Sequence, residues 1–398
     1  TKMVRMALQV LWARKRRVIG TATAIVLGVA FLSATLVLGD TLDASFGTVF
    51  RQANAGTDVV VRSATSINSD QGRQRATLDA SLVDQVAAVP GVARAVGEVT
   101  ATAQILDADG KPLGGQGPPT DGSAWVDDAQ LNPYHVTSGT APTKPGEIVI
   151  DENSASSGGI AVGDTATILT PDPVQATVVG LVGFGDSTSM AGATYVGFAP
   201  EQAVDLLGQP GQVSDLRVRG DGSTSAAELR DAIAEIVPDQ AEAITGDELT
   251  AEQQKDIQGD FLGFLKNFLL AFAGVALVVA TFSIANTFTI LAAQRSQESA
   301  LMRAIGASRS QVLRMAIIEA VVIGAAASMV GLAAGLGLAL GLKALLAGFG
   351  LDLPGDGLVV ETAPLVISFT IGLVATLVAA AMPAIRSSRV APIEALRD

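Results

Sequence analysis

The sequence contains no cysteine and a single histidine, His135, and only 4% of its residues are aromatic. Without cysteine the chain can form neither disulfides nor zinc sites with thiolate ligands. A Ser-His-Asp triad would depend on His135, and no Gly-x-Ser-x-Gly motif accompanies it. The phosphate-binding pattern Gly-x-x-x-x-Gly-Lys-Ser/Thr does not occur either. We therefore expect no catalytic residue, no metal site and no cofactor bound by this chain.

Charge is almost absent from four long stretches, which we predict as transmembrane helices over residues 18–39, 261–293, 315–342 and 363–383. A helix needs about 20 apolar residues to cross the hydrocarbon core of a bilayer. Helices in soluble cores seldom run that far without a charge. The first stretch follows four basic residues and is longer than the apolar region of a signal peptide, so we expect it to remain uncleaved.

Basic residues indicate on which side of the membrane each connecting segment lies. Residues 1–17 carry six Lys and Arg, residues 294–314 carry four, and the tail at 384–398 carries three. We therefore expect these segments, and with them both termini, in the cytoplasm. Arginine (19) far outnumbers lysine (7), which is typical of a GC-rich bacterial genome, so the membrane is expected to be a bacterial plasma membrane. The segment at 40–260 and the loop at 343–362 are then expected outside.

The N-terminal segment has apolar residues at helical spacing: Met3, Met6, Ala7, Val10 and Leu11. This spacing predicts an amphipathic helix on the cytoplasmic membrane surface over residues 1–17, in contact with lipid. A basic leader that only sets the topology explains the same residues equally well.

The outer segment is acidic, with 32 Asp and Glu against 11 Lys and Arg, so nucleic acid is not expected as a partner. Two strand-helix-strand patterns, at 55–106 and 212–250, predict a split ferredoxin-like subdomain. Between them, residues 107–211 are rich in Gly and Pro and contain short strand patterns, which predicts a small all-β subdomain. The expected fold class is thus an α+β membrane protein with four transmembrane helices and a large extracytoplasmic domain.

Two local predictions within this domain can be compared directly with a structure. We expect a helix over Leu78–Ala88, followed by one strand over Val92–Leu106. The acidic pairs Asp127-Asp128 and Asp151-Glu152 are expected to be solvated at the surface, with calcium binding as the alternative.

The cytoplasmic segment 294–314 carries a short amphipathic pattern. The apolar face consists of Leu301, Ala304, Ile305 and Val312, and Gly306-Ala307 is expected to end the helix before the third span. A short helix between two spans can dock into a groove on a partner protein.

Two motifs in the chain resemble those of a known family. The sequence RSQESALMRAIGASRSQVLRMAIIEA, which starts at Arg295, resembles the signature that follows the second span of FtsX-like permeases, a family that includes the MacB and LolC/LolE transporters. The sequence PAIRSSRVAPIEALR, which starts at Pro383, resembles the closing motif of that family. The number of spans and the large domain after the first span also agree, so the resemblance extends over the whole chain.

The resemblance implies the permease subunit of an ABC transporter, with porter-like (55–106 and 212–250) and sabre-like (107–211) outer subdomains. ATP and Mg would be bound by a separate cytoplasmic ATPase dimer, and a second permease subunit or module would complete the transporter. The substrate would be lipid-linked or amphipathic, and it would be exported or extracted. The residues expected to couple to the ATPase are Arg295, Glu298, Leu301, Arg303, Ile305, Gly306, Ala307 and Arg309.

Two other functions and one question of length stay open at this level. The chain could belong to a mechanotransmission complex that regulates an extracellular cell-wall hydrolase, which would be its extracytoplasmic partner. It could also be a membrane receptor without ATP coupling. Some permeases of this family carry two four-span modules in one longer chain, and this sequence ends where a first module would end, so we expect either a complete half-transporter or one half of a duplicated permease. The start at Thr1 rather than Met indicates trimming.

The third span contains two Gly-x-x-x-Gly pairs, Gly331 with Gly335 and Gly337 with Gly341. Such pairs allow helices to approach closely, either within one subunit or at a dimer seam. Glu319, one turn into this span, is expected at a helix interface with a local partner, and a role in coupling is the alternative.

Overall fold

The computed structural model describes residues 15–69, 72–114, 120–170, 172–294, 308–351, 355 and 357–389. The chain divides into two compact units. The helical unit comprises residues 1–42, 259–344 and 356–398, and the α/β unit comprises residues 43–258 and 345–355. Each unit is described by itself.

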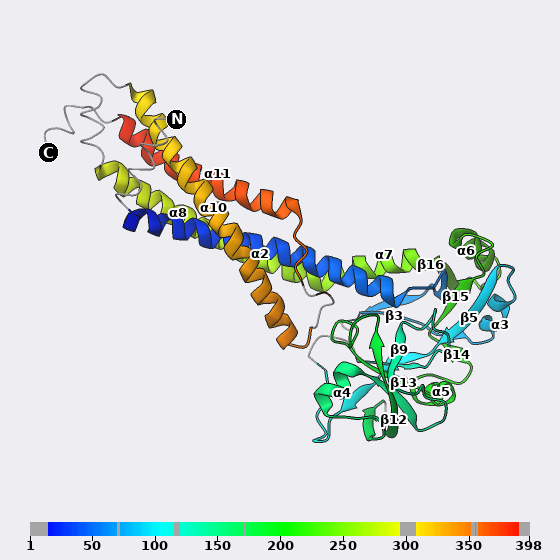
Figure 1. The fold of residues 1–398 in the computed structure, drawn as a ribbon. Coiled ribbons are helices and arrows are strands. Elements are labelled where there is room, and N and C mark those ends of the chain that lie inside the picture. The colour runs from blue at the N-terminus through cyan, green and yellow to red at the C-terminus, as the bar shows by residue number, and fades with distance from the viewer. Residues whose placement is uncertain are drawn as a thin grey trace. The chain divides into compact units, whose positions relative to one another are not determined.

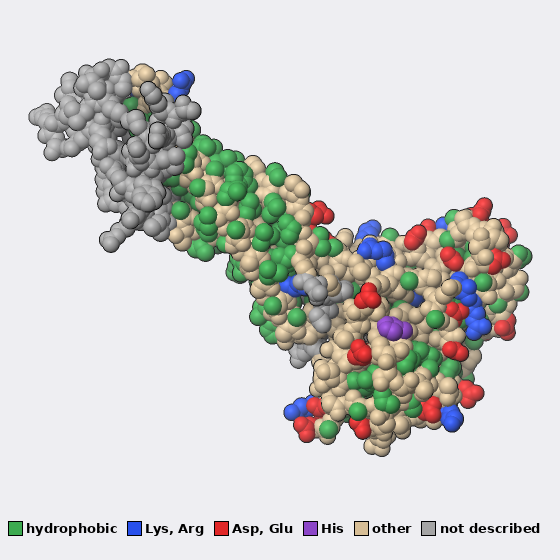
Figure 2. All heavy atoms as spheres, viewed as in Figure 1, with side chains coloured by type: hydrophobic (Ala, Val, Ile, Leu, Met, Phe, Trp, Pro, Cys, Tyr) green, Lys and Arg blue, Asp and Glu red, His purple; other side chains and the backbone are tan. Residues whose placement is uncertain are grey.

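The helical unit is built from α2 (Lys15–Ala53), α8 (Gly263–Gln294), α10 (Arg309–Gly348) and α11 (Thr362–Arg389), which Figure 1 shows as the long helices of the chain. Within the described ranges, these four helices contain stretches that are long and apolar enough to cross a membrane. Hydrophobic side chains cover much of their visible surface in Figure 2. Apolar residues on all sides of a helix are typical of a membrane span.

Small and aliphatic side chains pack the interior of the helical unit. One cluster of buried residues there consists of Ile25, Val29, Ile284, Phe288, Ala320, Ile323, Ala327, Ala379 and Ala380. The hydroxyls of Thr35, Thr281 and Thr376 donate hydrogen bonds of 2.7–2.9 Å to the carbonyl four residues earlier in the same helix. These side chains therefore satisfy their polar groups locally, as an apolar surrounding requires.

The first helix continues well beyond the predicted span 18–39. It runs without interruption to Ala53, and Gly56, at φ 77°, terminates the turn that follows it. Where the chain leaves the α/β unit, α7 (Gly246–Ile257) leads through a π-helical turn (Gln258–Leu262) into α8. Single π-helical turns inside helices are rare and occur frequently at functional positions.

A four-stranded antiparallel sheet forms the first part of the α/β unit. Its strands are β1 (Val59–Ser63), β5 (Val92–Glu98), β15 (Asp215–Gly220) and β16 (Ala241–Thr245), in the order β16-β1-β15-β5. The helices α3 (Leu82–Ala87) and α6 (Ala226–Ala234) connect β1 to β5 and β15 to β16. This order and these connections make a ferredoxin-like fold that is split between β5 and β15, as the sequence predicts.

Successive side chains of a strand point to opposite faces of a sheet, and here the two faces carry different kinds of residue. Val59, Val61, Leu216 and Val218 point to one face, where they are fully buried in a cluster that includes Leu82 and Val86 of α3 and Leu229 and Ile233 of α6. A capping box of Ser225 and Glu228 fixes the start of α6. The opposite face carries the intervening residues of the same strands, several of which are charged.

A mixed eight-stranded sheet forms the second part. Its strands are β6 (Thr100–Thr102), β7 (Gln104–Leu106), β8 (Thr120–Ala124), β9 (Tyr134–Gly139), β10 (Glu147–Asp151), β11 (Thr165–Leu169), β12 (Pro173–Phe184) and β13 (Thr194–Phe198). The pairing path is β6-β8-β13-β10-β12-β11-β7, with β9 beside β12. The two ends of this path, β6 and β7, are consecutive in the sequence and are separated only by Ala103.

Short elements complete the α/β unit. The hairpin of β2 (Ser66–Ser69) and β3 (Gly72–Arg75) and the pair of β4 (Leu78–Asp79) and β14 (Gln212–Val213) accompany the smaller sheet. The helices α4 (Glu152–Gly158) and α5 (Pro200–Leu207) accompany the larger one. The insertion therefore contains two short helices in addition to the predicted strands.

Two local predictions are wrong. The helix expected over Leu78–Ala88 begins only at Leu82, because Leu78 and Asp79 pair as a strand and the Asp79 carboxylate accepts a hydrogen bond from the Ser81 N–H in a turn. The strand expected over Val92–Leu106 is divided into β5, β6 and β7, because its first part pairs with β15 and the rest pairs within the larger sheet.

Candidate functional site

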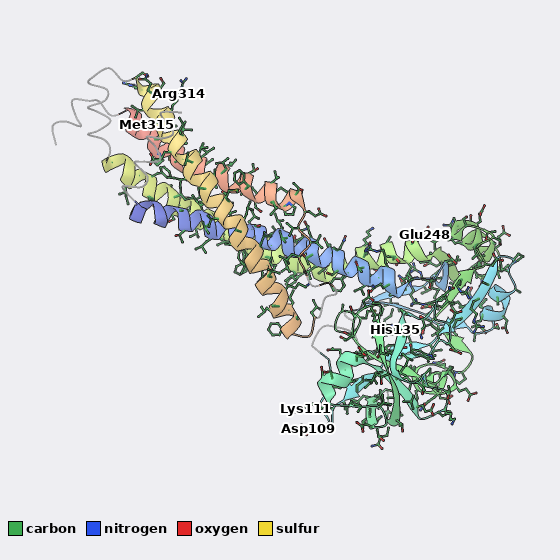
Figure 3. The ribbon with its side chains drawn as sticks, viewed as in Figure 1. Asp109, Lys111, His135, Glu248, Arg314 and Met315 are labelled. Carbon is green, nitrogen blue, oxygen red and sulfur yellow. The ribbon has the colours of Figure 1, made fainter. Side chains whose placement is uncertain are left out.

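Most of the predicted coupling residues lie outside the described part of the chain: Arg295, Glu298, Leu301, Arg303, Ile305, Gly306 and Ala307. The predicted N-terminal amphipathic helix also lies outside it, up to residue 14. Arg309 is the first residue of α10 and is exposed to solvent. Figure 3 labels Arg314 and Met315 near the same end of α10. The coupling assignment therefore stays a prediction.

The two Gly-x-x-x-Gly pairs lie in different surroundings. A Cβ on Gly331 would come within 2.8 Å of Val29 Cβ, and one on Gly335 within 2.8 Å of the Ala30 carbonyl oxygen, so α10 and α2 approach closely there. Nothing lies within 4 Å of the corresponding positions on Gly337 and Gly341. The first pair thus packs within this chain, and the second lies on an open part of α10 in the described structure.

Glu319 is buried within the helical unit, with a relative exposure of 7%. Its neighbours Ala320 and Ile323 belong to a cluster of buried residues in that unit. A carboxyl group at this depth is costly unless it interacts with other groups. The structure agrees with the predicted position at a helix interface, and Glu319 takes part in an interaction.

A network of charged side chains covers the second face of the four-stranded sheet. One row across the four strands consists of Glu242, Arg62, Asp215 and Glu98. The Arg62 guanidinium pairs with Glu242 at 2.8 Å and also with Glu252 of α7. From the β2-β3 hairpin, Arg75 pairs with both of these glutamates, at 2.9 and 3.3 Å. The network therefore joins three parts of the unit: the sheet, the hairpin and α7.

Arg217 connects this network to the end of α2. Its Nε lies 2.8 Å from Glu98 Oε1, and its Nη1 donates a 2.8 Å hydrogen bond to the carbonyl oxygen of Ala53, the last residue of the helix. A cation at a helix C-terminus satisfies an otherwise unpaired carbonyl and interacts favourably with the helix dipole. Next to it, the Asn54 amide donates to Thr250 and Gln253 of α7. Arg217 and Asn54 thus tie the end of α2 to the sheet and to α7.

Asp215 occupies the centre of the charged row. Burial, with an additional contribution from the Glu98 carboxylate, outweighs the opposing effects of Arg217 and Arg62 and raises the pKa of Asp215 to about 7. Burial also raises the pKa of Asp121 on β8. A carboxyl group that titrates near neutrality inside a cavity is a candidate functional group.

The acidic pairs and the histidine lie in different surroundings. Asp151 is fully buried rather than solvated, because its carboxylate oxygens accept hydrogen bonds from Ser154 N and Tyr195 N. Asp128 pairs with Arg219 at 3.2 Å. His135 lies exposed on β9, as Figures 2 and 3 show. In the part of the chain that the structure describes, no group of three or more potential metal ligands occurs.

The charged network was not predicted from the sequence, although a signal is present. In the run Asp215-Leu-Arg-Val-Arg219, charged residues alternate with aliphatic ones at the period of a strand. Such alternation normally indicates a strand with one face in solvent. Here the charged face is covered by α7 and by the hairpin, which lie far from β15 in the sequence.

Comparisons with known proteins place this arrangement in a family. A family model described as "MacB-like periplasmic core domain" matches residues 18–236, which is more than half of the chain. A model described as "FtsX-like permease C-terminal" matches residues 270–392. The chain belongs to the FtsX-like and MacB-like family of ABC transporter permeases. With its four apolar helices, this FtsX/MacB-type permease is a multi-pass membrane protein.

Individual relatives share parts of this permease. It is 28% identical over 265 residues to an uncharacterised ABC transporter permease of Mycobacterium tuberculosis, a match that covers 64% of this chain and 30% of that protein. It is 30% identical over 133 residues to the macrolide export ATP-binding/permease protein MacB of Bdellovibrio bacteriovorus, covering 33% of this chain and 19% of that protein. The chain spans about a third or less of the length of these two relatives.

Two solved structures resemble parts of the chain. The periplasmic region of MacB from Actinobacillus actinomycetemcomitans is 12% identical, with a TM-score of 0.38, and the match covers 50% of this chain and 94% of that one. The extracellular domain of the noncanonic ABC-type transporter YknZ from Gram-positive bacteria is 13% identical, with a TM-score of 0.32, and the match covers 47% and 98%.

Proposed function

We propose that this permease transmits movements driven by a separate cytoplasmic ABC ATPase dimer to its α/β unit outside a bacterial plasma membrane. ATP and Mg are bound by the ATPase, and both termini of the permease lie in the cytoplasm. A second permease subunit or module completes the transporter. The cargo is a lipid-linked or amphipathic molecule, which the movement of the α/β unit exports from the membrane or extracts from it.

The observation that carries this proposal is the continuity of α2. One uninterrupted helix includes the first predicted span and ends at Ala53, where Arg217 binds its last carbonyl. Because an α-helix is stiff along its axis, a displacement of the span is passed to residues at its end. Arg217 belongs to β15, in the middle of the four-stranded sheet, so the displacement reaches that sheet directly.

A second connection acts in parallel. The helix α7 is followed without a break by the π-helical turn and by α8, which contains the second span. A capping box of Thr245 and Glu248 fixes the start of α7 directly after β16, and Figure 3 labels Glu248 there. The Asn54 side chain binds Thr250 and Gln253 of α7. Two spans therefore continue into helices that are fastened to the same sheet.

The proposal predicts that the cytoplasmic segment between α8 and α10 is essential for coupling. The full-length permease would be reconstituted in lipid nanodiscs with its ATPase, and ATP hydrolysis and co-purification would be measured. We expect Glu298→Lys and Leu301→Asp each to weaken ATPase association and to lower permease-stimulated hydrolysis by about tenfold or more, as loss of a central interface contact does.

Glu361→Lys is the matched control, because Glu361 is exposed in the loop before α11, which we expect on the opposite side of the membrane. It should leave stimulated hydrolysis unchanged. If Glu298→Lys and Leu301→Asp both stimulate ATP hydrolysis as fully as the unchanged permease, the coupling assignment is refuted. Co-purification of a cell-wall hydrolase, together with normal hydrolysis but no cargo movement, would favour the mechanotransmission function instead.

A further inference from the structure

A cavity of about 680 Å³ lies over the charged face of the four-stranded sheet, entirely within the α/β unit. The strands β1 and β15 form its floor, with Arg62, Asp215 and Arg217. The hairpin, the larger sheet and α7 form its walls, to which they contribute Arg75, Asp121 and Gln253, respectively. The volume lies in the range of sites for small organic molecules.

The charges around this cavity are unequal. Each of the three lining arginines, Arg62, Arg75 and Arg217, pairs with glutamates: Glu242 and Glu252 for the first two and Glu98 for the third. The two lining aspartates, Asp121 and Asp215, take no part in these ion pairs. The paired arginines leave no surplus positive charge for an anion, whereas the aspartates supply negative charge for a cation.

One carboxyl oxygen of Asp215, at this cavity, lacks a hydrogen-bond partner in the described structure. This oxygen, Oδ1, is buried, although the Asp215 side chain lines the cavity. A buried carboxylate oxygen without a donor costs free energy. A ligand that donates a hydrogen bond to this carboxylate would remove that cost.

We infer that the cavity binds a small organic cation, whose ammonium or guanidinium group donates hydrogen bonds to the carboxylates of Asp215 and Asp121. The remaining lining suits such a molecule, because Thr100, Thr102, Ser214, Gln74 and Gln253 offer hydroxyl and amide groups to polar atoms along its length. A metal ion fits less well, because the described residues offer no cluster of three or more metal-binding side chains. The site does not depend on the proposed ATPase coupling, and binding can be measured without an ATPase.

The site also has a physical connection to α2. Arg217 lines the cavity beside Asp215 and binds the carbonyl oxygen of Ala53 at the end of that helix. A cation that neutralises Asp215 alters the charges that hold the Arg217 guanidinium in place. Occupancy of the cavity can therefore be sensed at the end of a membrane-spanning helix.

The experiment uses agmatine, which carries one guanidinium and one ammonium group, and the full-length chain in lipid nanodiscs. Isothermal titration calorimetry at about pH 8, where Asp215 is ionised, should show saturable binding of one agmatine per chain. We expect Asp215→Asn to weaken it by about tenfold or more, as the loss of a charge-assisted hydrogen bond does. Asp121→Asn should also weaken agmatine binding. Asp109→Asn, at the exposed turn labelled in Figure 3, should leave it unchanged.

Two further arms distinguish the chemistry of the ligand. Butylurea, a neutral probe, should not bind, and inorganic phosphate should neither bind nor displace agmatine. The inference is overturned if agmatine fails to bind at millimolar concentration, if Asp215→Asn and Asp121→Asn bind it as tightly as the unchanged protein, or if phosphate occupies the cavity. Because Asn has nearly the shape of Asp and carries no charge, Asp215→Asn should fold, and its thermal unfolding would verify this.

Discussion

On the face of the four-stranded sheet that α3 and α6 cover, Val59 and Leu216 are fully buried among aliphatic side chains. On the opposite face, Arg62 and Arg217 are almost as deeply buried, with side-chain exposures of 10% and 15%, but their neighbours are carboxylates. The aliphatic face requires only that apolar area leaves water. The charged face requires that its ion pairs stay intact, because a buried charge without a partner is expensive. The two faces should therefore respond differently to the loss of one side chain.

The largest effect should follow loss of Arg217 on the charged face. Arg217→Met keeps much of the side-chain volume but leaves Glu98 without its paired cation, removes a positive charge near Asp215, and leaves the Ala53 carbonyl without its donor. We expect the free energy of unfolding of the α/β unit to fall by about 4 kcal/mol, as for other broken buried pairs. Thermal unfolding followed by the fluorescence of Trp125, which is buried in this unit, would measure the change.

The matched control for this substitution is Arg94→Met on β5, because Arg94 is exposed on the same sheet. It should change the unfolding temperature very little. If Arg217→Met unfolds at the same temperature as Arg94→Met, the charged network does not hold the sheet and α2 together, and the main observation behind the proposed function loses its force.

A somewhat smaller effect should follow loss of a side chain on the aliphatic face. Leu216→Ala removes a fully buried side chain from the cluster with α3 and α6, at a cost of about 3 kcal/mol for the lost burial and the cavity left behind. Unlike Arg217→Met, it should leave the pH dependence of unfolding unchanged, because the residues of its cluster are aliphatic. Ile67→Ala, at a side chain that is 70% exposed, is the control and should be nearly neutral.

The sequence predicts the parts of this fold that depend on local pattern. The four spans follow from long runs without charge, and the strand-helix-strand units around the insertion follow from period-two and helical spacing. The broken strand after Val92 could not be predicted, because the change of partner at Val99 depends on β8 and β15, which are distant in the sequence. The helix start at Leu82 was missed because Asp79 forms a turn with Ser81.

The candidate site depended even more on tertiary structure. The residues that line the cavity come from β1, the hairpin, the larger sheet, β15 and α7. These elements are separate segments of the sequence, so the cavity is formed only when the chain folds. The charged alternation around Arg217 is visible in the sequence, but its burial is not. Conversely, the coupling motif is prominent in the sequence, and most of it lies outside the described residues.

The smallest of the three stability effects is a dependence on pH that distinguishes the two faces without removing a contact. The folded protein holds a proton on Asp215 up to about pH 7, whereas the unfolded chain loses it near the ordinary value of 3.8. Between these values the folded state binds more protons than the unfolded state, so stability falls as the pH rises from about 4 to about 7. The loss between about pH 5 and pH 7 should be on the order of 2 kcal/mol.

Asp215→Asn should remove this slope and should be more stable than the unchanged protein above about pH 7, where the buried carboxylate is ionised. The comparison is best made as the difference between the two unfolding profiles, because carboxylates with lowered pKa values, such as Asp128 and Glu147, contribute equally to both. Asp109→Asn should keep the slope. Parallel profiles for the unchanged protein and Asp215→Asn would mean that Asp215 is ionised across the whole range, and the charged face would then already contain a cation for it.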